Sequence, residues 1–433
     1  MASGANGVAE SGPVKADSKL AMVVAGGPAP GINSVIGAAT IRACLSDVEV
    51  VGILDGFSWL MAGDISRVVP LTIADTSRIH FRGGSFIGIS RANPTKRPGD
   101  IERVVDSLHR LGVGMLLTIG GDDTAFTAYK LAEAAAGTLR VAHVPKTIDN
   151  DLDLPHDVWT FGYQTARHVG VDIVHNLMVD AKTTGRWYFV VAMGRKAGHL
   201  ALGIGKAAGA TLTLIPEEFG ARGTTLGTIV DTLVGAIIKR RAYGRPDGVA
   251  VLAEGLAEIV PRDELGELGV SERDEHGNLR LDEFSLGEVC KRRVRERLEG
   301  LGLGATLVAK NIGYEVRCAD PIPFDMEYTR DLGYCAAQYV MDGGTNALVS
   351  IQQGRFVPVP FARIMNPETG RMRVRMVDIT SDLYRIAYAY MLRLKRSDFE
   401  DPGELAQLAA AAKMTPERLR AELGYLVEKD ESG

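Results

Sequence analysis

Two short acidic motifs in this sequence carry residue types that suit phosphoryl transfer. The first is Gly-Gly-Asp-Asp-Thr at residues 120–124, and the second is Pro-Lys-Thr-Ile-Asp-Asn-Asp at residues 145–151. Carboxylates hold Mg²⁺, whereas glycine N–H groups and a lysine hold phosphate oxygens. Lys146 and Thr147 could neutralise a moving phosphoryl group while a neighbouring carboxylate takes the proton of an acceptor alcohol. The two motifs therefore indicate Mg²⁺-assisted phosphoryl transfer.

The surrounding sequence predicts that both motifs lie at one edge of a sheet. An apolar run at residues 113–119 precedes the first motif, and another at residues 139–144 precedes the second. Residues 124–136 have the Ala, Lys and Glu content of a helix. Because open α/β sheets bind ligands at the carboxyl ends of their strands, the two loops can converge on one site.

Each motif also has a purely structural explanation. An aspartate or threonine before a helix often serves only as a cap, worth about 1 kcal/mol, and acidic turns are common on protein surfaces. Two adjacent acids after two glycines are more than capping requires, and the second motif places a lysine among its acids. The combination of the two motifs favours the functional interpretation.

Further loops at strand ends carry groups suited to a phosphosugar. A Gly/Pro-rich turn at residues 25–31 follows the first apolar run, where N–H groups at a helix N-terminus can meet phosphate. Arginine suits phosphate because its planar fork binds two oxygens. Each loop alone is explained as an ordinary connection, but such an explanation for all of them is improbable. The loops contain Gly83-Gly84-Ser85 with Ser90-Arg91, Met193-Gly194-Arg195 with Arg186 at the start of the same strand, Ala253-Glu254-Gly255, and residues 310–317.

Apolar, β-branched runs alternate with helix-like segments along the chain, which predicts an α/β fold with largely parallel sheets. Further predicted strands lie at residues 20–24, 48–54, 187–192, 210–215, 248–252 and 305–309. Predicted helices lie at residues 33–44, 161–180, 196–208, 225–243 and 285–301. Residues 258–284 form a charged insertion, and the segment from Asp398 has helix-forming composition, with Thr415 and Pro416 opening a helix.

Composition excludes several classes of protein. The 433 residues suffice for two or three domains or one bilobal enzyme. A net charge of −5 gives no reason to expect nucleic acid or an anionic membrane as a partner, and no stretch reaches the ~18 apolar residues of a membrane helix. The four scattered cysteines predict free thiols in a reducing cytoplasm. Residues 1–18 lack the apolar core of a signal peptide and predict a mobile tail.

In this order, the motifs resemble those of the phosphofructokinases, specifically the pyrophosphate-dependent branch. The resemblance runs from Leu20 to Arg330 and is most specific at residues 120–124 and 145–151. It implies two Rossmann-like lobes with mainly parallel sheets and an active site in the cleft between them. The implied reaction is the reversible, Mg²⁺-dependent transfer of phosphate from pyrophosphate to the 1-hydroxyl of fructose 6-phosphate. The products are fructose 1,6-bisphosphate and phosphate.

The resemblance also divides the chain into functional parts. Residues 19–160 would form the lobe that binds pyrophosphate and Mg²⁺, completed by residues 316–365. Residues 161–315 would form the sugar-phosphate lobe, and residues 366–433 a helical extension packed on the lobes or on a partner subunit. Neither the tail beyond about Asp398 nor the insertion at residues 258–284 occurs in the short relatives.

The resemblance assigns roles residue by residue. Asp149 would be the base that accepts the proton of the sugar hydroxyl, and Thr147 would hydrogen-bond the moving phosphoryl group. Arg186 would reach the sugar phosphate in a neighbouring subunit, which requires a homodimer or homotetramer. The donor site would comprise Asp122 as the Mg²⁺ ligand, Asp151 as a further acid, Gly27 in the phosphate turn, Arg91 bridging donor and acceptor, and Asp123 and Lys146. The sugar site would comprise Thr147, Ile148, Asp149, Met193, Gly194, Arg195, Glu254, Lys310, Tyr314, Glu315, Val316 and Arg317.

The choice of phosphoryl donor also has a physical argument. ATP-using relatives have glycine where this chain has Asp123, and usually glycine where it has Lys146. A carboxylate at position 123 would occupy the room of a nucleotide α-phosphate and repel its charge. Lys146 would add positive charge beside a departing phosphate that lacks an adenosine. Both residues favour pyrophosphate.

One departure from the family pattern concerns regulation. In allosteric bacterial relatives, two arginines on the first helix bind the effector nucleotide, and the corresponding positions are Gly37 and Ile41. We therefore expect no response to ADP or phosphoenolpyruvate at that site.

Other functions remain open from the sequence. They include an ATP-dependent phosphofructokinase, a pyrophosphate-dependent kinase of another phosphosugar such as sedoheptulose 7-phosphate, and a regulatory subunit that only binds sugar phosphate. The intact Asp122, Thr147 and Asp149 disfavour the regulatory subunit. NAD and lipid kinases lack the second motif with Met-Gly-Arg, and a nicotinamide-binding dehydrogenase would need dinucleotide glycine spacing at residues 25–31.

Overall fold

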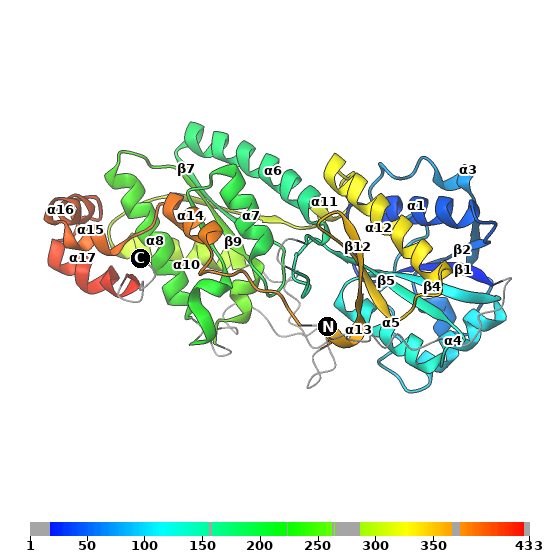
Figure 1. Ribbon diagram of the computed structural model, residues 1–433. Coiled ribbons are helices and arrows are strands. Elements are labelled where there is room, and N and C mark those ends of the chain that lie inside the picture. Colours follow the sequence, from blue (N-terminus) through cyan, green and yellow to red (C-terminus); the bar gives the residue numbers. More distant parts are fainter. Residues whose placement is uncertain are drawn as a thin grey trace, which may run out of the picture. The chain divides into compact units, whose positions relative to one another are not determined.

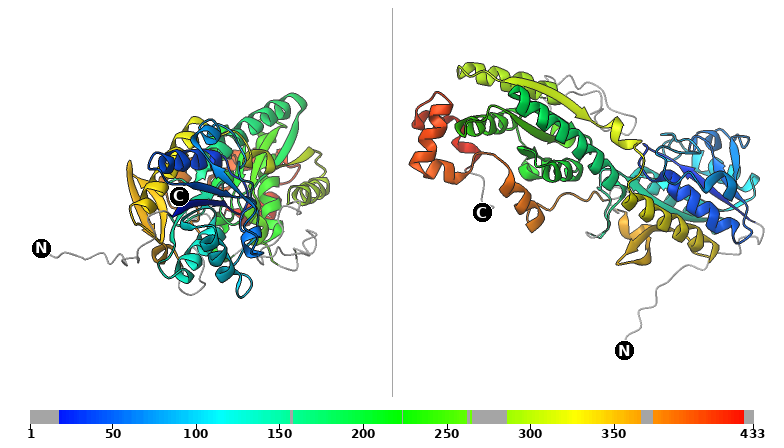
Figure 2. Two further views of the ribbon diagram at one scale, coloured as in Figure 1. Left: turned by 90° about the vertical axis from the view of Figure 1, so that its right-hand side faces the viewer. Right: turned by 90° about the horizontal axis from the view of Figure 1, so that it is seen from above.

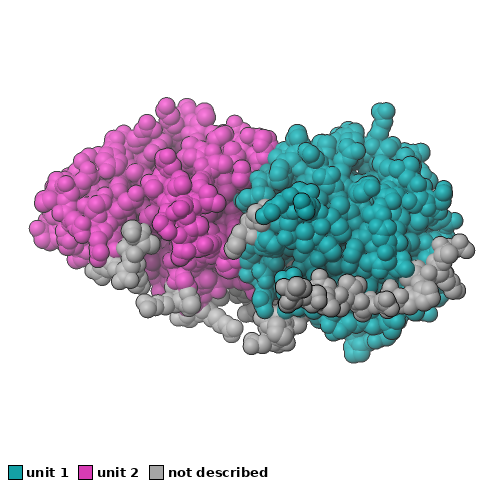
Figure 3. All heavy atoms as spheres, viewed as in Figure 1, with its two compact units in different colours: residues 1–166, 315–375 teal, residues 167–314, 376–433 magenta. Residues whose placement is uncertain are grey.

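The computed structural model describes residues 18–155, 158–222, 224–261, 264, 286–365 and 373–427. The chain forms two compact units (Figure 3). Unit 1 comprises residues 1–166 and 315–375, and unit 2 comprises residues 167–314 and 376–433. The predicted tail lies outside the described residues except for Ser18, and the predicted insertion lies outside them except for residues 258–261 and 264.

Unit 1 contains a mixed sheet in the strand order β12-β11-β5-β4-β1-β2-β3, with the short β6 (Phe161–Gly162) beside β5. Its central strands pair in parallel, whereas the edge strands β3 and β12 are antiparallel to their neighbours. Central strands are buried on both faces, which explains their continuous apolar runs. The strands are β1 (Lys19–Val24), β2 (Val50–Ile53), β3 (Val68–Leu71), β4 (Val113–Gly120), β5 (Arg140–Thr147), β11 (Ala347–Gln352) and β12 (Arg355–Pro360).

Helices cover both faces of this sheet (Figure 1). On one face α1 (Ile32–Cys44) packs along α12 (Pro323–Met341), and on the other α4 (Asp100–Arg110) packs against α5 (Asp122–Ala134). Short helices complete the unit: α2 (Ser58–Met61), α3 (Ile73–Thr76) and α13 (Phe361–Ile364). Two helices cross the boundaries between units, α6 (Tyr163–Thr184) and α11 (Tyr314–Arg317).

Unit 2 contains a parallel sheet in the order β10-β7-β9-β8. Trp187 on β7 is fully buried opposite Gly248 on β9, and a Cβ at Gly248 would lie 2.6 Å from the indole ring. The glycine therefore makes room for the largest core side chain of the unit. The strands are β7 (Arg186–Ala192), β8 (Leu212–Leu214), β9 (Gly248–Ala253) and β10 (Thr306–Ile312). They are accompanied by α7 (His199–Ala208), η1 (Pro216–Arg222), α8 (Leu226–Ala242), η2 (Glu254–Glu258) and α10 (Leu286–Gly300).

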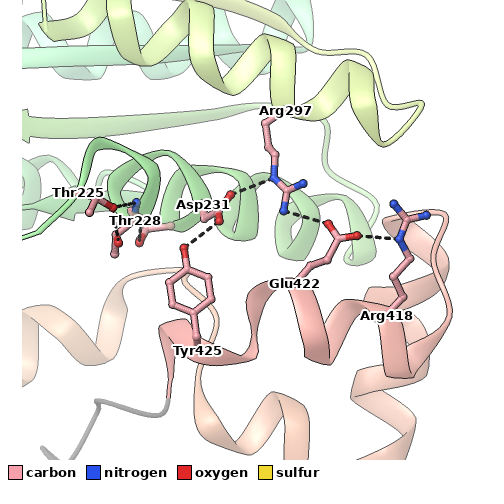
Figure 4. Close-up of polar contacts among 8 residues, drawn as sticks. Thr225, Thr228, Asp231, Arg297, Arg418, Glu422 and Tyr425 are labelled. Atoms are coloured by element: carbon pink, nitrogen blue, oxygen red, sulfur yellow. Dashed lines mark hydrogen bonds and ion pairs between the residues drawn. The ribbon is translucent and has the colours of Figure 1, made fainter. Parts of the chain in front are cut away.

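The C-terminal helices belong to the core of unit 2 (Figure 2). Figure 4 shows Arg297 on α10 paired with Asp231 on α8 and with Glu422 on α17, while the Tyr425 hydroxyl donates to Asp231. Lys239 and Asp398 form a buried ion pair at 2.6 Å. These contacts join the extension to α8 and α10. The extension comprises α14 (Asp382–Tyr390), α15 (Arg396–Glu400), α16 (Pro402–Ala411), α17 (Pro416–Leu423) and η5 (Gly424–Leu426).

The structure confirms the predicted α/β class with mainly parallel sheets, and each predicted strand and helix named above is present with small shifts at its ends. Thr415 caps α17 by accepting from the Arg418 N–H at 3.3 Å, with Pro416 at the first helical position, as predicted. Within the described ranges, every helix is too short or too polar to cross a membrane.

Candidate active site

The glycine-rich turn between β1 and α1 is fixed by backbone hydrogen bonds. The Ala25 N–H donates to the Ile119 carbonyl at 3.0 Å, and the Gly26 N–H donates to the Ser90 carbonyl at 2.9 Å. Gly26 has a φ of 88°, a left-handed conformation that glycine adopts readily. The turn therefore lies beside the carboxyl end of β4 and beside Ser90, which the exposed Arg91 follows in the chain.

Lys146, at the end of β5, joins this turn to both acidic motifs. Its side chain is buried, and its Nζ donates to the Gly27 carbonyl. A Cβ at Gly121 would lie 3.6 Å from the Lys146 carbonyl oxygen, so the second motif passes close to the first. The structure therefore brings the three predicted phosphate-binding segments of unit 1 together around one lysine.

The acids of the first motif open helix α5. Asp122 and Asp123 lie in its first turn, where the helix dipole favours negative charge. A Cβ at Gly120 would lie 2.3 Å from the Thr124 side chain, so glycine is required at that position.

A buried histidine, which the sequence analysis did not identify, supports the same loop. The Nε2 of His143 lies 3.1 Å from the Gly120 carbonyl, and its Nδ1 lies 2.8 Å from the Thr118 hydroxyl. Burial lowers the pKa of His143 to about 3, so the ring is neutral at pH 7. A neutral ring that donates from Nε2 to the carbonyl accepts the Thr118 hydroxyl proton at Nδ1. Only its place one strand away from Gly120 in the fold reveals this role.

The loop that follows β5 is largely buried. The Asp149 N–H donates to the Thr147 hydroxyl at 3.0 Å, and the Thr160 hydroxyl donates to the Thr147 carbonyl at 2.7 Å. Asp149 is 9% exposed, and Asn150 is buried with a left-handed φ of 55°. The side chain of Ile148 is buried in the core, so this residue offers only backbone groups to a substrate.

Arg317 lies in unit 1, against the glycine turn. A Cβ at Gly27 would lie 3.4 Å from an Nη atom of Arg317. The sequence analysis assigned Arg317 to the sugar, and the structure places its guanidinium beside the predicted pyrophosphate turn. Its neighbour Glu315 is exposed, whereas Val316 is fully buried and offers only backbone groups.

In unit 2, most of the predicted sugar-binding residues gather at the carboxyl ends of three strands. The N–H groups of Gly194 and Arg195 both lie 3.3 Å from one carboxylate oxygen of Glu254, to which they donate. The Met193 N–H donates to the Ile312 carbonyl at 3.0 Å, which ties the loop to β10. Arg195 is exposed and has a left-handed φ of 44°, a strained conformation of the kind that clusters at functional sites.

Glycines allow this close approach between loops. A Cβ at Gly255 would lie 2.2 Å from the Arg195 carbonyl, and a Cβ at Gly313 would lie 3.1 Å from the Met193 side chain. Tyr314, the next residue, is 62% exposed. The structure therefore brings together Met193, Gly194, Arg195, Glu254 and Tyr314.

Two predicted sugar-binding residues lie elsewhere in unit 2. Arg186 is at the amino end of β7 and pairs with Asp180 at 3.7 Å. At about 3.3 Å per residue, β7 separates Arg186 from the Met193 loop of its own chain by roughly 20 Å. Lys310 is exposed on the edge strand β10, in register with Val190 on β7.

Glu217 supports the loop after β7, and sequence analysis missed it. One carboxylate oxygen accepts from the Gly198 N–H at 2.8 Å and from the Val377 N–H at 2.9 Å. Burial raises the pKa of Glu217. Its sequence context, an acid in the first turn of η1, carries no local signal of this role.

The donor set in unit 1 fits Mg²⁺. Among the residues that the structure describes, no group of three or more His, Cys, Asp or Glu side chains is arranged to hold a metal ion alone. Mg²⁺ is usually bound by one or two carboxylates together with waters and substrate phosphates. Asp122 at the start of α5, beside the predicted phosphate-binding turn, is a carboxylate of that kind.

Comparisons with known proteins agree with this architecture. Residues 19–340 match the family model described as Phosphofructokinase. The chain is 49% identical over 415 residues to the pyrophosphate–fructose 6-phosphate 1-phosphotransferase of Thermotoga maritima, covering 95% of this chain and 99% of the relative. It is 48% identical over 418 residues to the enzyme of that name from Naegleria fowleri, covering 94% and 96%.

The fold is also shared with a solved structure. The pyrophosphate-dependent phosphofructokinase of Nitrosospira multiformis superposes with a TM-score of 0.66 at 17% identity, covering 88% of this chain and 93% of that one. At that identity the likeness concerns the fold alone. The family match and the two relatives cover most of the sequence, and the chain therefore belongs to the phosphofructokinase family.

Proposed function

We propose that this protein transfers a phosphoryl group reversibly from pyrophosphate to the 1-hydroxyl of fructose 6-phosphate, with Mg²⁺ as cofactor. The observation that carries the proposal is the position of Lys146. Its buried ammonium donates a hydrogen bond to the Gly27 carbonyl in the glycine turn, next to both acidic motifs. A lysine fixed there neutralises the charge of a leaving phosphate. The names of the close relatives support the choice of donor and acceptor.

In the proposed mechanism, Asp149 accepts the proton of the sugar 1-hydroxyl as that oxygen attacks phosphorus. Thr147 accepts the Asp149 N–H, which fixes the loop that carries the base. Asp122, with Asp151 as a further acid, would hold Mg²⁺, which when bound neutralises charge on the donor oxygens. Because phosphoryl transition states are loose, positioning and charge neutralisation supply most of the acceleration.

The proposed donor selectivity rests on two side chains of unit 1. Asp123 occupies the first turn of α5, where a nucleotide would place its α-phosphate, and repels that charge. Gly27, Arg91 and Lys146 bind the pyrophosphate. Arg317 lies against Gly27, and its planar guanidinium binds the pyrophosphate as well as the sugar phosphate.

The proposed acceptor site uses the unit 2 loops. Met193, Gly194, Arg195, Glu254 and Tyr314 bind the sugar, with Lys310, Glu315 and the backbone of Ile148 and Val316 as further contacts. Arg186 binds the sugar phosphate of a neighbouring subunit, because β7 separates it from its own Met193 loop. The active form is then a homodimer or homotetramer, working in the cytoplasm.

Product formation from fructose 6-phosphate and Mg²⁺, with pyrophosphate and ATP at equal concentration, tests the proposal. Turnover with pyrophosphate alone supports both the donor and the sugar. Turnover with ATP contradicts the argument from Asp123 and Lys146. No turnover with either donor rejects the stated reaction, and sedoheptulose 7-phosphate is then the next acceptor to assay.

A further inference from the structure

We propose that Arg375 is a positioning residue that holds the Asp149 loop in its working conformation. This inference rests on the proposed role of Asp149 as the base. Arg375 lies 225 residues beyond Asn150 in the chain and is 6% exposed.

The guanidinium of Arg375 donates to a ring of loop acceptors. Its Nε donates to the Asn150 carbonyl at 3.1 Å, and one Nη donates to the Asn150 side-chain oxygen. The other Nη lies within 3.3 Å of three carbonyl oxygens, those of Leu154, Pro155 and Val158.

Backbone contacts fix Arg375 itself against the same loop. Its N–H donates to the Asp151 carbonyl at 2.7 Å, and Val374 forms an isolated antiparallel bridge with Leu152. The segment that carries Arg375 therefore runs along the loop as a short extra strand, and the side chain reaches back toward Asn150.

The carbonyls that accept from Arg375 belong to the loop that carries Asp149. The first of them is that of Asn150, the residue directly after Asp149. Asn150 holds a left-handed φ, and its side-chain oxygen also accepts from the Thr160 N–H at 3.2 Å. Loss of a partner leaves a buried carbonyl that costs about 1–3 kcal/mol. A loop that relaxes to regain such partners moves Asp149, and a 1 Å misplacement of a reacting group can cost about 10²-fold in rate.

The charge of Arg375 is compatible with this role. Burial lowers its pKa, and the nearby carboxylates of Asp151 and Asp153 oppose that effect. A planar fork with five donors satisfies several carbonyls at once, which the single ammonium of a lysine does not reproduce.

The test compares Arg375→Lys with a matched control, Arg140→Lys. Arg140 lies in the same unit and also donates to backbone carbonyls, those of Val340 and Met341, but at the amino end of β5. We expect Arg375→Lys to lower kcat about 30–100-fold, with the KM of each substrate changed less than about threefold. Arg140→Lys should keep the wild-type kcat, whatever its melting temperature.

Hydrogen exchange and chemical rescue separate positioning from general stability. Amides of residues 149–154 should exchange faster in Arg375→Lys, while those of β4 and α5 keep the wild-type rate. In Arg375→Gly, added guanidinium ion should restore part of kcat. The proposal is overturned if the folded Arg375→Lys variant has the wild-type kcat. It is also overturned if amides throughout unit 1, and not only in this loop, exchange faster in that variant.

A milder variant covers the case in which Arg375 variants do not fold. Asn150→Gly tolerates the left-handed φ and removes only the side-chain acceptor. It should lower kcat with little change in KM, and wild-type kcat would contradict the proposal. If the wild-type protein lacks pyrophosphate-dependent turnover, the proposed function fails, whereas the local amide exchange of residues 149–154 still reports whether Arg375 orders the loop.

Discussion

The two units hold their predicted binding loops in different ways. In unit 1, the side chains that define the loops are themselves buried: Lys146, Asp149 and Asn150 are each 9% exposed or less. In unit 2, the corresponding loop leaves Arg195 exposed and depends on one carboxylate, Glu254, for two backbone hydrogen bonds.

The difference matches the two chemical tasks proposed for the units. Phosphoryl transfer depends on groups fixed where charge develops, and burial with many hydrogen bonds supplies that rigidity. Recognition of a sugar phosphate depends on exposed groups that meet the ligand on arrival. Substitutions in unit 1 should therefore act mainly on kcat, and those in unit 2 mainly on KM.

The largest effect should come from the base. Asp149→Asn removes the proton acceptor while keeping the shape of a buried side chain, so we expect kcat to fall by about 10³-fold, with the KM of fructose 6-phosphate changed little. Steady-state kinetics with both substrates varied provide the measurement. A kcat near wild type would mean that another group takes the proton.

The next effect concerns the donor. Asp123→Gly removes a side chain of the predicted donor site together with the charge that opposes a nucleotide phosphate, so we expect pyrophosphate-dependent kcat/KM to fall about 100-fold, equivalent to about 2.7 kcal/mol. ATP-dependent turnover should rise above the wild-type background. Asp106→Gly, at an exposed position on α4, serves as the matched control. An unchanged preference for pyrophosphate over ATP would mean that Asp123 does not determine the donor.

A smaller effect is expected in unit 2. Glu254→Ala deprives the Gly194 and Arg195 N–H groups of their acceptor, and hydrogen bonds to a charged group are worth about 1.5–3 kcal/mol. The KM of fructose 6-phosphate should rise about 10–30-fold, with kcat and the KM of pyrophosphate changed less than threefold. A loss confined to kcat would contradict the expectation that substitutions in unit 2 act mainly on KM.

The remaining effect is on stability. His143 has a folded-state pKa of about 3 and an unfolded value of 6.5, so the unfolded chain binds a proton that the folded chain does not. Its neutral burial therefore stabilises the protein above pH 6.5, and this contribution declines as pH falls, by at most about 1.4 kcal/mol per pH unit. His143→Gln should flatten the unfolding free energy between pH 6.5 and 4.5. An identical pH profile for the variant would contradict this account.

The sequence predicted most of the central strands and the two acidic motifs because those signals are local, but it missed β11, which lies between β5 and β12 in the sheet. The apolar run at residues 113–119 and the strand β4 nearly coincide. The edge strands β3 and β12 were missed, since Pro70 and the proline-containing β12 lack the continuous apolar pattern of buried strands. Their antiparallel pairing also departs from the alternation that the sequence displays.

Site residues divide in the same way. Lys146 and Glu254 stand inside recognisable motifs, and the structure gives each of them a bonded partner in its own unit. His143, Glu217 and Arg375 act through backbone groups that lie far away in the sequence or on a neighbouring strand. No local pattern marks such a residue, because its role exists only after the chain has folded.

The separation of Arg375 from its loop also affects how the protein is made. A ribosome that has synthesised Asn150 must add 225 further residues before Arg375 exists. At about 5–20 residues per second, this interval lasts about 11–45 s. During that time the nascent unit 1 carries Asp149, the proposed base, on a loop whose carbonyls lack the Arg375 donor. The newly made enzyme should therefore gain activity only after nearly the whole chain has been translated.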